Sequence, residues 1–231
     1  MVRPAAVVLA LAAASPAWAE APLFTDPAAI VERGTCSFET WHQWSRGGGH
    51  EGWALPACSV HPLLELGAGF ARARREDAGS HTLVLLRARS AFAADADGRW
   101  SLGGRLDALR DGTRDGGSEG IDEVAARALA TVRIPQAGLR FHLNAGAARL
   151  RSEDTFAIWG VAGEVDFAHD WTLAAEFFRD QPGGPSWQAA LRYLLVFDRV
   201  ELFVSGGDAR GRERSGWFAI FGARFQSPPL F

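Results

Sequence analysis

The sequence predicts an all-β protein, an antiparallel transmembrane β-barrel of about ten strands, or twelve if an N-terminal hairpin joins the sheet. Apolar residues recur at every second position in successive segments between about His61 and Phe225, and this period is typical of β-strands. Each segment has about the ten residues that a tilted strand needs to cross a bilayer. The connections alternate between short turns and mostly longer, polar loops, as they do in transmembrane barrels.

The start of the chain has the order of a secretory signal peptide. Arg3 supplies a positive charge, an apolar run follows over residues 5–14, and the small residues Ala17 and Ala19 predict cleavage after Ala19. The run is shorter than the roughly 20 residues of a membrane-spanning helix, and no later stretch is long and apolar enough for one. An uncleaved anchor is the alternative. The chain is thus divided into a signal peptide (1–19), a hairpin segment (20–60) and a barrel (61–231).

The two cysteines of the chain, Cys36 and Cys58, both follow the predicted cleavage site. An exported chain enters an oxidising compartment, so this pair predicts a disulfide rather than a metal site. The closed loop of about 22 residues is worth roughly 3 kcal/mol in the loop-entropy model. Three glycines at 47–49 lie midway and indicate a hairpin stapled at its base. We expect ten strands plus this hairpin, which then plugs or caps the periplasmic mouth; if the hairpin joins the sheet, the barrel has twelve strands.

The two faces of the predicted strands indicate which side meets lipid. In hydrocarbon only a closed barrel satisfies every backbone hydrogen bond, so the apolar face points outward and the polar face inward. The polar face carries charges of both signs among many small residues, which predicts a narrow lumen filled by salt bridges. The predicted lumen charge network consists of Glu65, Arg87, Arg89, Arg105, Asp107, Arg127, Arg133, Arg140, Glu164, Asp166, Glu176, Arg192, Glu201 and Arg224. The pattern also places Arg99 and His142 on this face.

Tryptophans near strand ends fit the aromatic girdles of a membrane barrel. The predicted girdle residues are Trp100, Trp159, Trp171, Trp187 and Trp217. Three further tryptophans of the hairpin either pack together or sit at an interface: Trp41, Trp44 and Trp53. The alternative fold is a secreted, soluble β-sandwich that binds a ligand. Its strands have the same two-residue period, but their apolar residues point inward. So many aromatic residues at strand ends are unusual for such a sandwich.

The signal peptide, the alternating strands and the final stretch GWFAIFGARFQSPPLF together resemble bacterial outer-membrane β-barrel proteins. The resemblance implies a Gram-negative outer-membrane location, contact with outer-membrane lipid, and recognition by the barrel-assembly machinery through a terminal phenylalanine. Phe225 or Phe231 carries this assembly signal. Because prolines at 228–229 interrupt strand pairing, we expect Phe225 to close the last strand and a short tail to follow.

The composition of the chain and its lack of common catalytic motifs argue against several classes of function. The formal net charge is −3, so nucleic acid is not an implied partner. The sequence contains no G-x-S-x-G, H-E-x-x-H or phosphate-loop motif. We therefore expect a porin-like barrel with a structural or small-solute permeation role, with no catalytic residues, metal or cofactor. The sequence leaves the oligomeric state and the solute open.

An outer-membrane enzyme that modifies lipid is the alternative function, and it needs a serine activated by a histidine. Ser80 and His81 are adjacent, but neighbours in an extended strand point to opposite faces. His142 and Asn144 share a face without forming a recognisable triad. The sequence therefore favours a barrel that is not an enzyme.

Three further groups of residues suggest binding sites, and each has a simpler interpretation as exposed surface. Three histidines lie near the hairpin at a spacing that matches no metal motif: His42, His50 and His61. One loop carries residues at calcium-loop positions but lacks flanking helices: Asp111, Thr113, Asp115, Gly116, Glu119 and Asp122. The arginines of another loop suit lipid phosphates or pair with neighbouring acids: Arg210, Arg212 and Arg214.

Overall fold

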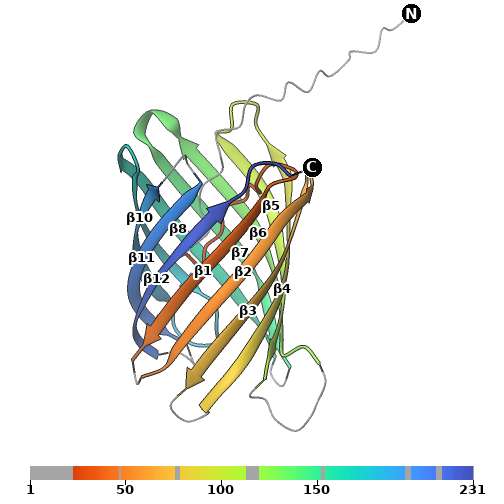
Figure 1. Ribbon diagram of the computed structural model, residues 1–231, viewed down its shortest axis with the longest axis vertical. Coiled ribbons are helices and arrows are strands. Elements are labelled where there is room, and N and C mark those ends of the chain that lie inside the picture. Colours follow the sequence, from red (N-terminus) through yellow and green to blue (C-terminus); the bar gives the residue numbers. More distant parts are fainter. Residues whose placement is uncertain are drawn as a thin grey trace, which may run out of the picture.

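The computed structural model describes residues 23–46, 48–75, 79–112, 120–151, 154–195, 199–211 and 215–230. Within these ranges, twelve strands form one closed barrel in which sequential strands are antiparallel neighbours and β1 pairs with β12 (Figure 1). The strands are β1 (Cys36–Ser45), β2 (His50–His61), β3 (Leu64–Arg75), β4 (Gly79–Ala94), β5 (Trp100–Asp111), β6 (Glu123–Ile134), β7 (Leu139–Leu150), β8 (Thr155–Ala168), β9 (Trp171–Arg179), β10 (Ser186–Leu195), β11 (Val200–Arg210) and β12 (Ser215–Gln226). The closed barrel is not two stacked sheets, so the β-sandwich alternative is wrong.

The N-terminal hairpin is part of the barrel wall. Its first strand, β1, pairs with both β2 and β12, and β2 pairs with β3. The expectation of ten strands plus a separate hairpin is therefore wrong, and the twelve-strand alternative is correct. The predicted disulfide between Cys36 and Cys58 is confirmed. The alternation of β1 is weak in the sequence because Thr40 and His42 occupy two positions on the lipid-facing side.

Exposed apolar residues alternate with buried polar residues along the strands. In β12, Phe221 and Phe225 are 60% and 47% exposed, whereas Arg224, which lies between them in the sequence, is 2% exposed. All five predicted girdle tryptophans are exposed. Trp100 and Trp171 begin their strands, while Trp159 lies further along β8 and faces Ala145 of β7. The apolar face of the wall is thus the outer face.

The barrel has two different ends. The connections from β2 to β3, β4 to β5, β6 to β7, β8 to β9 and β10 to β11 lie at the end where β1 begins and β12 finishes, which we call the turn end (Figure 1, top). The other connections lie at the opposite end, the loop end. At the loop end, β3 continues to Arg75 and β4 begins at Gly79.

The described residues contain one short helical element. The short 3-10 helix η1 (Pro135–Ala137) connects β6 to β7, and Gly138 ends it with a φ of 61°. In the described part of the chain, no helix has the length and apolar character needed to span a membrane.

Residues 23–35 precede β1, and we call them the inner segment. Residues 23–31 lie inside the barrel, whereas Glu32 and Arg33 are exposed. Leu23, Thr25, Asp26, Ala28 and Val31 are all buried, although they belong to no strand. The hairpin was one candidate for a plug, but it is the chain before the hairpin that occupies the interior.

Candidate functional site in the barrel interior

The inner segment enters the barrel at the turn end. The backbone N–H of Gly34 donates to the carbonyl of Ser59 at 2.8 Å, and Ser59 N–H donates to the carbonyl of Thr35 at 2.9 Å. The N–H of Leu230, in the tail after β12, donates to the carbonyl of Gly34 at 2.8 Å. Strand β2 and the C-terminal tail therefore fix the point where the segment passes from the wall into the interior.

From this entrance the segment runs along most of the barrel. Val31 lies beside Glu65, near the start of β3 at the turn end, with its N–H 3.5 Å from Glu65 Oε2. Phe24 stacks on Phe178, which lies next to the last residue of β9 at the loop end, with ring centroids 4.3 Å apart. The segment therefore extends through the barrel interior from the turn end to the loop end.

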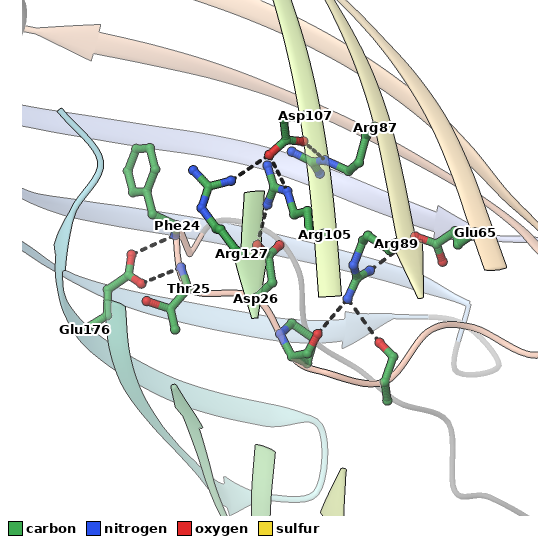
Figure 2. Close-up of polar contacts among 12 residues, drawn as sticks. Phe24, Thr25, Asp26, Glu65, Arg87, Arg89, Arg105, Asp107, Arg127 and Glu176 are labelled. Atoms are coloured by element: carbon green, nitrogen blue, oxygen red, sulfur yellow. Dashed lines mark hydrogen bonds and ion pairs between the residues drawn. The ribbon is translucent and has the colours of Figure 1, made fainter. Parts of the chain in front are cut away.

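Glu176 of β9 binds the backbone at the far end of the inner segment (Figure 2). Its two carboxylate oxygens accept the N–H groups of Phe24 and Thr25, each at 2.8 Å. The side chain of Gln188 on β10 donates to the same carboxylate at 2.6 Å. Glu176 is only 2% exposed, so these donors replace the water that an ionised carboxylate would otherwise bind.

Arg89 of β4 binds the middle of the segment from the opposite side of the barrel (Figure 2). Its Nη2 donates to the carbonyls of Pro27 and Ala29 at 2.7 and 3.0 Å. Its Nη1 donates to Glu65 of β3 at 3.2 Å. One guanidinium thus joins two carbonyls of the segment to a carboxylate of the wall.

Two neutral side chains of the wall complete the backbone contacts. Thr131 Oγ1 accepts the N–H of Ala28 at 2.9 Å. The amide of Asn144 faces Asp26, and its hydrogen bonds assign the orientation: the nitrogen donates to the Asp26 carbonyl at 2.9 Å, and the oxygen accepts the Asp26 N–H at 2.6 Å. Buried backbone groups need such partners, since each orphaned group costs about 1–3 kcal/mol.

An ionic cluster surrounds the side chain of Asp26 (Figure 2). Arg105 of β5 pairs through Nη1 with Asp26 and through Nε with Asp107 Oδ2, the latter at 2.7 Å. Asp107 also pairs with Arg127 of β6 at 2.6 Å and with Arg87 of β4 at 3.1 Å. None of these side chains is more than 14% exposed.

A second ionic cluster lies on the wall formed by β7, β8 and β10. Glu164 pairs with Arg140 and Arg192, each at 2.7 Å, and lies 3.5 Å from His142. Arg140 also donates to both carboxylate oxygens of Asp166 at 2.7 Å. On β12 and β1, Arg224 lies 3.4 Å from Glu39, an acid that the predicted network did not include.

The remaining residues of the predicted network have these positions. Glu201 is buried on β11, and Arg133 is half-buried on β6. Asp166, near the end of strand β8, has a side chain that is 41% exposed. The prediction for Arg99 is wrong: it lies in the turn before β5, 64% exposed and 3.2 Å from Asp97, because β5 begins only at Trp100.

An aromatic cluster holds the tip of the inner segment. Phe24 stacks on Phe178 and meets Phe218 edge-on at 6.5 Å between ring centroids. Phe203 and Ile220 belong to the same buried cluster. This cluster was not predicted, because only polar residues were assigned to the lumen. Adjacent phenylalanines such as Phe177 and Phe178 are the signal for it, since they make both faces of β9 apolar near the loop end.

The hairpin tryptophans and histidines divide between the two faces of the wall. Trp41 and Trp53 stack at 5.6 Å, and Trp41 packs against the aromatic cluster. Trp44 is exposed and lies 4.4 Å from the ring of His42. The rings of His42 and His50 are 5.6 Å apart, while His61 Nδ1 accepts the N–H of Leu63. Among the described residues, His, Cys, Asp and Glu form no group of three or more that suits a metal ion.

The other candidate positions are only partly described. Ser80 is exposed and His81 is buried 3.7 Å from Asp111, so the strand separates serine from histidine. Four of the predicted calcium-loop positions lie outside the described residues: Thr113, Asp115, Gly116 and Glu119. Asp122 accepts the N–H of Asp111 at 2.8 Å. Arg210 pairs with Asp208 at 3.5 Å, and Arg212, Arg214 and Phe231 are also outside the described ranges.

The fold is similar to the solved structures of several bacterial outer-membrane proteins. The KdgM porin is 12% identical, with a TM-score of 0.64 over 82% of this chain and 98% of that one. The COG4313 outer-membrane channel from Pseudomonas putida F1 is 10% identical, with a TM-score of 0.62 over 88% and 100% of the two chains. Omp33 from Acinetobacter baumannii is 8% identical, with a TM-score of 0.53 over 84% and 98%. These likenesses confirm the predicted resemblance at the level of the fold.

Sequence comparison assigns the family. No curated protein matches the chain. Residues 7–225 match the family described as "Uncharacterised conserved protein UCP029691", so the chain belongs to this family and has the fold of the bacterial outer-membrane β-barrels.

Proposed function

We propose that this protein is a small-solute channel of the bacterial outer membrane and that its own inner segment closes the channel. The signal peptide predicted over residues 1–19 and the apolar outer wall support this location. The fold is shared with a porin and an outer-membrane channel, which supports permeation by analogy of fold. A barrel of twelve strands also encloses more space than the eight strands whose interior side chains can fill.

The way in which the segment is held carries this proposal. A barrel with a purely structural role needs only side chains that fill its interior. Here Glu176, Arg89 and Thr131 instead bind backbone atoms of a segment that belongs to no strand. These contacts are hydrogen bonds that water can replace, worth about 1 kcal/mol net for the neutral one and about 1.5–3 kcal/mol for those to charged groups. The segment is therefore a ligand of the wall as well as a part of the chain, and its withdrawal opens the path.

The test compares two full-length mature chains in planar bilayers. In F24D, a carboxylate replaces the ring that stacks on Phe178, and the cost of burying a charge among phenylalanines drives the tip out of the barrel. In R33D, the control, the same residue is introduced in the same segment at an exposed position. We expect brief, rare current steps for the unaltered protein and for R33D, and long open periods for F24D.

Folding is checked separately by a gel on which intact barrels migrate differently before and after boiling. An F24D barrel that passes this check and still carries no current at any voltage would contradict the channel and leave a structural role. Equal current from F24D and R33D would contradict closure by the inner segment.

A further inference from the structure

The site occupied by Asp26 has an excess of positive charge when the barrel wall is considered without the inner segment. Three wall arginines meet there: Arg87, Arg105 and Arg127. They share one wall carboxylate, Asp107, so three positive charges face one negative charge. Asp26 supplies the second carboxylate, but it belongs to the segment and not to the wall. With the segment in place, none of the three guanidinium groups is more than 14% exposed, and withdrawal of the segment leaves them with one carboxylate partner.

Asp107 cannot replace Asp26. Its Oδ2 already receives Arg105 Nε and Arg127 Nη1, and its Oδ1 receives Arg87 Nε. Arg105 presents a different edge, Nη1, to Asp26. Because a guanidinium is rigid and planar, Nε and Nη1 keep their separate directions, and Nη1 continues to point at the vacated position. Loss of Asp26 leaves Nη1 of Arg105 without its carboxylate partner, and a charge-assisted hydrogen bond to another anion would restore the pairing.

Neutral groups beside the arginines add a second kind of recognition. Asn144 presents one donor and one acceptor to the backbone of Asp26, and Thr131 Oγ1 accepts the N–H of Ala28. When the segment leaves, these groups become available to the hydroxyl or amide groups of a solute. The surroundings of Asp26 thus suit a small molecule that carries a carboxylate next to polar, uncharged groups.

We infer that the position of the Asp26 carboxylate is a binding site for the carboxylate of an acidic, hydroxyl-bearing solute, and that Asp26 is a tethered competitor for this site. The claim that this solute passes through the barrel rests on the proposed function, since a closed structural barrel would transport no solute. The site itself depends only on Arg105, its neighbours and the exchange of one carboxylate for another.

The first experiment tests the site without requiring conduction. In full-length D26A, the lost carboxylate leaves room for formate, which restores the pairing with Arg105. We expect sodium formate to raise the thermal unfolding midpoint of D26A by about 3 °C or more relative to equal sodium chloride. The unaltered protein, where Asp26 fills the site, and D26A/R105Q should show no such difference. If formate and chloride changed the unfolding midpoint of D26A equally, the inference would be overturned. A change with phosphate as large as that with formate would also overturn it, because the site would then bind anions without preference for a carboxylate.

The second experiment tests the solute in the F24D barrel, where the segment tip is displaced. Gluconate and sorbitol are matched probes, because they are polyols that differ at a terminal carboxylate. We expect gluconate, and not sorbitol, to interrupt the current, and R105Q to raise the half-blocking gluconate concentration about tenfold. R99Q, which removes an exposed arginine outside the cluster, is the control.

The outcomes separate the two proposals. A folded F24D barrel without current contradicts the channel, while the formate result still decides the site. A conducting barrel that gluconate blocks equally with and without Arg105, or that sorbitol blocks as well, contradicts the acidic solute and leaves the channel standing. If D26A/R105Q does not fold, the comparison of D26A with the unaltered protein alone decides, since only D26A should distinguish formate from chloride.

Discussion

Thr25 of the inner segment lies directly against Gly160 of β8, so that a β-carbon on Gly160 would overlap Thr25 Oγ1. The three heavy atoms nearest to such a β-carbon all belong to Thr25, so the inner segment, and not the wall, is its nearest obstacle. The missing side chain at Gly160 is therefore part of the site that receives the inner segment.

The first prediction concerns this contact. G160A should loosen the segment, because overpacking of a filled interior costs about 1–3 kcal/mol. We expect more frequent open events in planar bilayers than for the unaltered protein, with a barrel that still shifts on the boiling gel. G163A is the matched control: it lies on the lipid-facing side of the same strand, where a β-carbon meets Phe141 at an ordinary 3.6 Å. Identical currents from both variants would argue against steric seating of Thr25 on Gly160.

The second prediction concerns Glu176. Replacement by alanine removes the acceptor of the Phe24 and Thr25 N–H groups, and each orphaned donor costs about 1–3 kcal/mol. Hydrogen exchange of these amides in E176A should accelerate by tenfold or more, while the amides of β8 and β9 keep their protection. The control is E32A, an exposed acid of the same segment. Unchanged protection of Phe24 and Thr25 would mean that the wall does not hold this end of the segment.

The lipid-facing pattern of the strands was predictable because a membrane wall imposes one requirement on every second residue. In β12, Phe221 and Phe225 had to be apolar and Arg224 did not, so the period appears directly in the sequence. The pairing of Cys36 with Cys58 was also predictable, because two cysteines in an exported chain leave a single choice. The number of strands was not, since Thr40 and His42 lower the contrast between the faces of β1.

The inner segment was not predictable from its own residues. Its contacts join positions far apart in the chain, for instance Phe24 and Glu176 across 152 residues, and no local period encodes them. Pro27 and the absence of alternation argue against a strand, but they do not indicate where the segment lies. The charged residues around Asp26 were expected to neutralise one another within the wall, and the surplus of Arg87, Arg105 and Arg127 over Asp107 appears only when the partners are counted in space.

The third prediction concerns the disulfide at the entrance. Cys36 and Cys58 join β1 to β2 at the turn end, beside the residues that lead the inner segment inward. Loop entropy gives a contribution of about 3 kcal/mol, and β1 is also hydrogen-bonded to two neighbours. We expect C36S/C58S to fold into a barrel with a lower thermal midpoint on the boiling gel. A thiol reductant should lower the midpoint of the unaltered protein to the same value and leave the double variant unchanged; a reductant effect on both would point away from this bond.

The fourth prediction concerns the end of the last strand. Phe225 is paired with Phe38 of β1 and Val200 of β11 and is 47% exposed on the outer wall. After Gln226 the chain leaves the strand: Ser227 N–H donates to the Cys36 carbonyl and Leu230 N–H to the Gly34 carbonyl, each at 2.8 Å, so the tail bends over the entrance of the inner segment. Phe225 is thus the last lipid-facing aromatic residue of β12, as a terminal assembly signal requires.

In cells, F225A should therefore lower the amount of protein that reaches the outer membrane several-fold, whereas the purified variant should still refold in detergent. F92A removes a comparable lipid-facing ring, 66% exposed near the turn end of β4, and should assemble normally. F231A separates the two candidate signals in the same assay, because the strand that the assembly machinery would pair ends before residue 231. Normal assembly of F225A together with failure of F231A would show that the assembly signal lies in the tail. Equal defects in F225A and F92A would show that the loss of any lipid-facing ring impairs assembly, and not the loss of a specific signal.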